Sequence, residues 1–280
     1  MKFLCAFLLI QSFSFARAQI NTFSEKNSYE LNDEGDGILV EKFDSTIVDP
    51  NKYNQNNLIF KVGDRFKYKF EHFTPNGEKR YFQTKGKRRK KWEFVDENYT
   101  DSATVKFVTI EVANGNPMAV YYPNYNQTCL MYRLGSSEKF SISGAIENEA
   151  NVWIHPPRDN YFRILELNPF PYIKSPFKIG TKWSWHLEIG DSWADKRWKT
   201  WKGRIENKYN YEISNTVILE TALGEIECYI IKSTANSRIG ETKLTSYFNP
   251  KYGFIKLEYT NIDGSKTNLE MVEIKKAKSP

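Results

Sequence analysis

The stretch that decides the fold reads Arg65-Phe66-Lys67-Tyr68-Lys69-Phe70-Glu71-His72. Aromatic residues alternate with charged ones along it, which is the period-two pattern of a strand with one buried side and one solvent-facing side. The turn sequence Thr74-Pro75-Asn76-Gly77 follows, and apolar residues resume at Tyr81. Because proline and glycine at such positions favour a tight turn, the sequence predicts a β-hairpin here.

The same pattern continues through the rest of the chain, and no long amphipathic helix is indicated. The sequence therefore predicts an all-β fold of antiparallel, curved sheets, either a half-barrel or a sandwich. Further strands are expected at 92–95, 104–112, 130–133, 139–143, 151–154, 182–189, 204–213, 217–221, 226–233, 244–248, 254–260 and 267–274.

The two halves of the chain begin alike. Residues 61–68 and 178–185 share the order Lys, aliphatic, Gly, any residue, basic, aromatic, any residue, aromatic. A duplicated β domain would produce this similarity, and so would two independent strand starts of similar chemistry. We expect a β-rich domain at 38–157, a proline-rich connection at 158–177, and a β-rich domain at 178–280, similar to the first if the chain is duplicated.

The N-terminus has the pattern of a secretory signal peptide at residues 1–18. Lys2 precedes an apolar run, 3–10, and Ala16-Arg17-Ala18 matches the cleavage signature of small residues. The apolar run is too short to span a bilayer. We therefore expect an exported protein, periplasmic or extracellular and soluble after cleavage, whose polar residues 19–37 form a flexible tail.

The positive charge of the chain is local. The 280 residues include 40 Lys and Arg against 34 Asp and Glu, a formal net charge of +6, and six basic residues lie in the single run 85–91. This distribution excludes a broad nucleic-acid-binding face. The run is interpreted either as a solvated loop or as a contact to an anionic envelope surface. The candidates for anion contact are Lys87, Arg88, Arg89, Lys90 and Lys91.

Five tryptophans gather within nineteen residues, namely Trp183, Trp185, Trp193, Trp198 and Trp201. The first two share one face of an expected strand, which favours burial. The other three lie in a polar stretch, 190–203, that reads as a long hairpin loop. Exposed there, they could stack on sugar rings or cover an apolar ligand. The alternative is a core covered by tryptophan, with basic neighbours stacked on the rings.

No catalytic or metal-binding motif occurs in the sequence. It contains three His and three Cys and lacks the H-E-x-x-H, G-x-S-x-G, G-x-G-x-x-G and P-loop patterns. His155, Arg158 and Asp159 lie close together, but no second His or Cys accompanies them, so a hydrolase is a distant alternative. Cys129 and Cys228 either pair in an oxidising compartment or stay separate as buried side chains. We expect no enzymatic activity, no metal and no cofactor.

Three landmarks of the second half resemble one family. They are Gly180-Thr181-Lys182-Trp183-Ser184-Trp185, the segment 221–228 (TALGEIEC) and the segment 247–256 (YFNPKYGFIK). Together, over 178–274, they are similar to the open half-barrel family of the periplasmic lipoprotein carriers and related uncharacterised envelope domains. The resemblance implies consecutive strands of a curved sheet with an apolar concave face, and it brings no catalytic residues.

These observations favour a non-enzymatic function at the cell envelope. The first expectation is a protein that binds an apolar or amphiphilic ligand in its curved sheet or in a groove between domains, with the five tryptophans as candidate contacts. One alternative is a carbohydrate-binding module that uses Trp193, Trp198 and Trp201. Another is a structural or surface-interaction protein without a small ligand.

Overall fold

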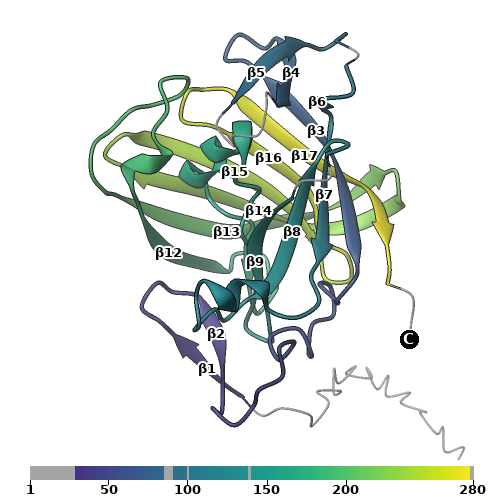
Figure 1. Ribbon diagram of the computed structural model, residues 1–280, viewed down its shortest axis with the longest axis vertical. Coiled ribbons are helices and arrows are strands. Elements are labelled where there is room, and N and C mark those ends of the chain that lie inside the picture. The colour runs from purple at the N-terminus through teal and green to yellow at the C-terminus, as the bar shows by residue number, and fades with distance from the viewer. Residues whose placement is uncertain (1–28, 85–90, 100, 138–139, 278–280) are drawn as a thin grey trace, which may run out of the picture.

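The structure, a computed structural model, describes residues 29–84, 91–99, 101–137 and 140–277. The chain is nearly all β with antiparallel strands, as the sequence predicts. A continuous sheet of 15 strands is strongly curved, and a two-stranded sheet lies below it in the view of Figure 1. The signal-peptide prediction at 1–18 falls outside the described residues.

The small sheet pairs β1 (Tyr29–Asp33) with β2 (Leu39–Phe43). The strands of the large sheet are β3 (Arg65–Phe73), β4 (Lys79–Thr84), β5 (Trp92–Asp96), β6 (Thr104–Val105), β7 (Phe107–Val112), β8 (Thr128–Leu134), β9 (Phe140–Glu147), β10 (Asn151–Ile154), β11 (Tyr172–Lys174), β12 (Lys182–Ile189), β13 (Ile205–Thr221), β14 (Gly224–Ser237), β15 (Gly240–Asn249), β16 (Gly253–Thr260) and β17 (Lys266–Lys275). The described residues also form the short 3-10 helices η1 (Pro117–Val120), η2 (Asn160–Leu167) and η3 (Asp191–Trp193).

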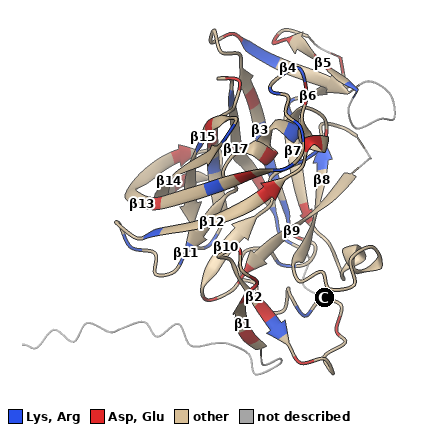
Figure 2. Cartoon of the chain, turned by 90° about the vertical axis from the view of Figure 1, so that its left-hand side faces the viewer, with Lys and Arg blue, Asp and Glu red and all other residues tan. Residues whose placement is uncertain are grey.

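The large sheet follows the order β11-β10-β9-β8-β7-β3-β17-β16-β15-β14-β13-β12, and β4 carries β5 and β6 beside β3. Its middle is β3, the strand that opens the sequence argument, where Phe66, Tyr68 and Phe70 point into the core. Charged residues of both signs are interspersed along the strands (Figure 2). The period-two pattern therefore marks a strand with a buried inner side and a charged outer side.

The two halves of the chain share this one sheet. β3 from the first half pairs with β17 from the second, with Phe70 opposite Leu269. Residues 38–157 and 178–280 thus supply neighbouring strands of one sheet rather than two separate sheets. The physical reason is pairing, since each half alone would leave the edge of a central strand without backbone partners.

The expected tail also contains ordered structure. Residues 29–33, within the stretch 19–37, form β1 because the turn that follows folds the chain back onto β2. Asp33 Oδ1 accepts hydrogen bonds from the backbone N–H groups of Gly35 (2.8 Å) and Gly37 (3.0 Å), which fixes that turn. These hydrogen bonds lower the pKa of Asp33.

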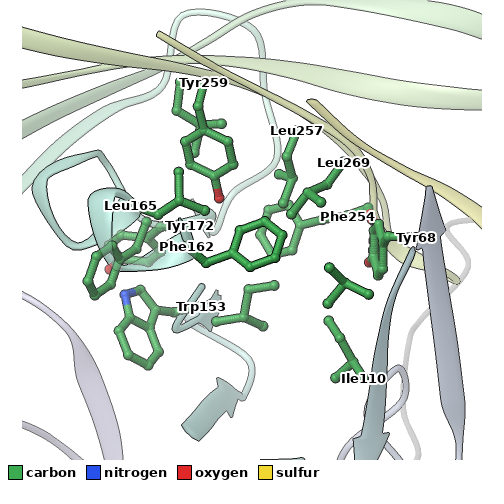
Figure 3. Packing of buried hydrophobic residues seen from close by; sticks show 14 of the residues in the cluster. Tyr68, Ile110, Trp153, Phe162, Leu165, Tyr172, Phe254, Leu257, Tyr259 and Leu269 are labelled. Carbon is green, nitrogen blue, oxygen red and sulfur yellow. Dashed lines mark hydrogen bonds between the residues drawn. The ribbon is translucent and has the colours of Figure 1, made fainter. Parts of the chain in front are cut away.

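The proline-rich segment 158–177 is a core element rather than a connection. Within η2, Phe162 and Leu165 are fully buried. The ring of Phe162 lies 4.9 Å from that of Phe70 and 5.6 Å from that of Phe82, centroid to centroid. Figure 3 shows Phe162 and Leu165 among side chains of the surrounding strands, with Leu257 nearby. The concave side of the sheet is therefore occupied by the protein's own residues.

The two ends of the large sheet approach each other and are bridged by the turn between β1 and β2. At β11, the Tyr172 hydroxyl donates to the carbonyl oxygen of Gly37 (3.3 Å). At β12, the His186 N–H donates to the carbonyl oxygen of Asp36 (3.4 Å). The rings of Tyr172 and Trp183 are 5.6 Å apart across this seam. The result is a single sheet nearly closed on itself, not a sandwich of two sheets.

A buried polar network joins β3, η2 and β17. The Tyr161 hydroxyl lies 2.8 Å from His72 Nδ1 and 2.7 Å from Thr267 Oγ1. Burial lowers the pKa of His72 to about 4. The imidazole is therefore neutral in the folded protein at the pH at which it would take up a proton in the unfolded chain.

We expect the stabilising contribution of His72 to depend on pH. Above pH 6.5 it is fully present, and it is lost as the pH falls from 6.5 to about 4, because only the unfolded chain binds the proton in that window. The difference in unfolding free energy between the wild type and a His72→Gln variant should shrink by on the order of 2 kcal/mol over this range. Denaturant titrations at a series of pH values measure this difference. A difference that stays constant with pH would contradict the prediction.

None of the helices in the described part of the chain has the length and hydropathy needed to cross a membrane.

Candidate functional site

Four of the five candidate tryptophans belong to the core. Trp183, Trp185, Trp198 and Trp201 are only 5% to 9% exposed. The ring of Trp185 stacks on Tyr209 at 4.5 Å, and that of Trp183 stacks on Tyr211 at 5.3 Å. The structure thus favours the second interpretation for these four residues, a core covered by tryptophan. They are not placed to stack on a ligand.

Arg197 and Trp198 pack the loop 190–203 against Trp92 of β5. Trp198 stacks on Trp92 with 6.3 Å between ring centroids and 9° between ring planes. The guanidinium carbon of Arg197 lies 3.9 Å from the Trp92 ring centroid and 5.6 Å from that of Trp198. Burial alone would raise the pKa of Asp195, but hydrogen bonds from Arg197 lower it below its usual range. The loop is therefore a fixed cover of the core.

Trp193 is the exception, because it is only half-buried and lies beside an open groove. The groove has a volume of about 1170 Å³. Its walls come from the loop between β7 and β8, from β9 and β10, from the start of η2, and from Trp193 at η3. These segments are distant in sequence and meet only in the folded chain.

The rim of the groove is aromatic and rich in amides. Tyr121, Tyr122 and Phe140 are 75%, 60% and 45% exposed. The amide side chains of Asn124, Asn126 and Gln127 line the same wall. Exposed aromatic rings next to hydrogen-bonding amides are typical of surfaces that recognise polar ligands.

The sequence carries a signal for this rim that the sequence analysis missed. No charged residue occurs between Glu111 and Arg133, although 26% of the chain is charged. An ordinary solvated loop would include charges, so an exposed loop rich in Tyr and Asn without any is a candidate recognition surface.

Gly144 on β9 leaves room for two side chains of this loop. A Cβ atom at Gly144 would fall 1.8 Å from Gln127 Oε1 and 2.4 Å from the Tyr125 hydroxyl, far inside contact distance. The Tyr125 hydroxyl in turn donates to Gln127 Oε1 (3.1 Å). A side chain at position 144 would therefore force the ends of the Gln127 and Tyr125 side chains to move.

His155 and Glu166 form a pair below the groove. His155 Nδ1 lies 2.8 Å from the carbonyl oxygen of Pro156, to which it donates, and Nε2 lies 3.4 Å from Glu166 Oε2. Burial would raise the pKa of Glu166, but the neighbouring His155, Arg158 and Arg163 lower it. Both ring nitrogens face oxygen atoms of the protein, so the imidazole is not placed as a base toward the groove.

Other sequence candidates lie elsewhere. Cys129 and Cys228 are separate, buried and unpaired. The described residues contain no group of three or more His, Cys, Asp or Glu side chains that could hold a metal ion. Of the candidates for anion contact, Lys91 is exposed, whereas Lys87, Arg88, Arg89 and Lys90 lie outside the described residues.

No protein-family model matches the chain. No curated protein matches it either. Similar solved structures include a candidate exported protein with a YmcC-like fold from Bacteroides fragilis, 12% identical with a TM-score of 0.38, covering 78% of this chain and 98% of that one. A candidate lipoprotein from Parabacteroides distasonis is 11% identical with a TM-score of 0.41, covering 78% and 97%.

The hypothetical lipoprotein YmcC from Escherichia coli is 7% identical with a TM-score of 0.33, covering 79% of this chain and 90% of that one. The resemblance over 178–274 remains an interpretation of the sequence.

Proposed function

We propose that this chain is an exported, non-enzymatic protein that binds a carbohydrate in the groove beside η1. The observation that carries the proposal is the open groove of about 1170 Å³ with Tyr121, Tyr122 and Phe140 exposed on its rim. Aromatic faces pack against the apolar faces of sugar rings, and amide groups donate to and accept from sugar hydroxyls. An open groove suits a chain-like ligand better than a closed cavity would.

The location outside the cytoplasm rests on the signal-peptide pattern of residues 1–18. The absence of enzymatic activity is part of the proposal and is supported by the position of both ring nitrogens of His155, which face oxygen atoms of the protein.

An apolar or amphiphilic ligand, the first expectation from the sequence, has less support. The concave side of the sheet, which would hold such a ligand, is filled by η2, with Phe162 and Leu165 fully buried. The groove that is open has amide groups along its wall. These would lose hydrogen bonds to water beside an apolar ligand without replacement.

The test is a glycan array of neutral and acidic sugars, probed with residues 19–280. We expect the wild type to bind at least one class of glycan. A Tyr122→Ala variant should bind that glycan at least about tenfold more weakly than the wild type, because stacking area at the rim is lost. The matched control is Ile218→Ala, an exposed residue of β13 outside the groove, which should bind like the wild type.

An array without any signal contradicts the proposal. So does binding that Tyr122→Ala leaves unchanged. Saturable binding of a solvatochromic probe such as 1-anilinonaphthalene-8-sulfonate to the native protein, with no glycan bound, would instead favour the amphiphile.

A further inference from the structure

Two arginines share the ring of Trp193 at the groove. The guanidinium carbon of Arg163 lies 4.5 Å from the ring centroid and that of Arg158 lies 5.0 Å from it. Both arginines also line the groove. Because guanidinium groups cover the indole, Trp193 positions the arginines and is not itself a platform for a sugar ring.

The hydrogen-bonding capacity of these arginines is largely unused within the protein. Among the described residues, Arg158 makes no hydrogen bond or ion pair, and its contact is the ring of Trp193. Arg163 donates through Nη2 to the carbonyl oxygen of Ser192 (2.5 Å), while its buried Nε has no acceptor in the described part of the chain. Arg158 therefore presents a guanidinium group that rests against Trp193 and whose donors are not used within the described part of the chain.

Two guanidinium groups and one carboxylate line the groove near Trp193. Among the described lining residues, Arg158 and Arg163 carry positive charge and Asp159 is the acidic one. Glu166 is buried 3.4 Å from His155 and is not among the described lining residues. An anionic group that enters the groove therefore meets more positive than negative charge on its described walls.

We infer that the ligand of this groove carries an acidic group and that Arg158 binds it. The inference rests on the proposed function and narrows its ligand to an acidic glycan. A planar guanidinium matches a carboxylate with two parallel hydrogen bonds, and it matches a phosphate or sulfate oxygen pair in the same way. The contact with the ring of Trp193 restrains the Arg158 side chain, so less side-chain freedom is lost on binding.

The experiment compares pairs of glycans that differ only in the acidic group. The probes are oligogalacturonates against their methyl esters, phosphorylated against dephosphorylated mannan oligosaccharides, and heparin oligosaccharides against their desulfated forms. The three pairs separate a carboxylate from a phosphate and from a sulfate. Affinities are measured by titration calorimetry for the wild type and for Arg158→Gln, Arg158→Lys and Arg204→Gln.

We expect one acidic probe to bind at least about tenfold more tightly than the partner that lacks the acidic group in question, since charge-assisted hydrogen bonds are the strong ones. Arg158→Gln should remove that difference, and Arg158→Lys should retain only part of it because lysine lacks the planar fork. Arg204→Gln, at an exposed ion pair with Glu188 outside the groove, should not change it.

Equal affinity for both members of every pair, unchanged in Arg158→Gln, overturns the inference and leaves carbohydrate binding intact. Failure to bind any glycan on the array and any of these probes overturns the proposed function itself. The two failures are therefore distinguishable.

Discussion

Replacing Phe162 by alanine is expected to lower the free energy of unfolding by about 4 kcal/mol. The side chain is fully buried in η2 and contacts the rings of Phe70 at 4.9 Å and Phe82 at 5.6 Å. Alanine would leave a cavity at the centre of the curved sheet, where strands on all sides limit relaxation. Equilibrium denaturation followed by tryptophan fluorescence and circular dichroism measures the change.

The matched control is Phe140→Ala. This phenylalanine is 45% exposed at the groove, so its loss should lower the unfolding free energy by less than about 1 kcal/mol. Equal losses for the two variants would mean that η2 does not fill the sheet. A Phe162→Ala variant that is nearly as stable as the wild type would mean the same.

The second large effect is expected at Glu147, a buried residue at the end of β9. Its carboxylate accepts three backbone hydrogen bonds, from the N–H groups of Leu58 (2.8 Å), Ile59 (2.8 Å) and Phe60 (3.0 Å). These bonds fix the segment that leads into β3. Glu147→Ala would leave three amide groups without an acceptor and is expected to lower the unfolding free energy by about 4 kcal/mol.

Two further variants separate this role from a general effect of charge. Glu147→Gln keeps the shape of the side chain but places an amide N–H group opposite one of the backbone N–H donors. We therefore expect it to lower the unfolding free energy by about 2 kcal/mol. Glu149→Gln, two residues away and exposed, should change the stability by less than about 0.5 kcal/mol. Denaturant titration of Glu147→Ala, Glu147→Gln and Glu149→Gln checks that the loss of unfolding free energy decreases in this order. Similar losses for Glu147→Gln and Glu149→Gln would contradict the assigned hydrogen bonds.

The strands follow from the sequence where the period-two pattern is strong. The predicted ranges 151–154 and 182–189 match β10 and β12. The ranges 204–213 and 217–221 are one strand, β13, because a β-bulge between Ile213 and Asn215 carries the pairing through the polar residues that were interpreted as a break.

The core segment η2 could not be predicted in the same way. It is an eight-residue 3-10 helix whose polar residues, Asn160, Arg163 and Glu166, recur at every third position, and so short a segment gives a weaker sequence signal than the alternation along a strand. The prolines on either side of it favoured a linker. Only the closure of the sheet around it explains why Phe162 and Leu165 are inside.

The groove could be predicted only in part. The charge-free run between Glu111 and Arg133 marks one wall in the sequence. The other walls come from Gly144, from Arg158 and from Trp193, which the strand order brings together across the fold. The high number of tryptophans favoured the segment 183–201 instead, where four of the five rings are buried in the core.

The most direct test of the central claim, that the ligand lies in the groove and not inside the sheet, is hydrogen–deuterium exchange with and without the glycan that binds most tightly on the array. We predict slower exchange in the loop 117–127 and in 153–159, and no change in β15, β16 and β17. Slower exchange in β15, β16, β17 and η2, with unchanged exchange in the loop 117–127, would contradict the account.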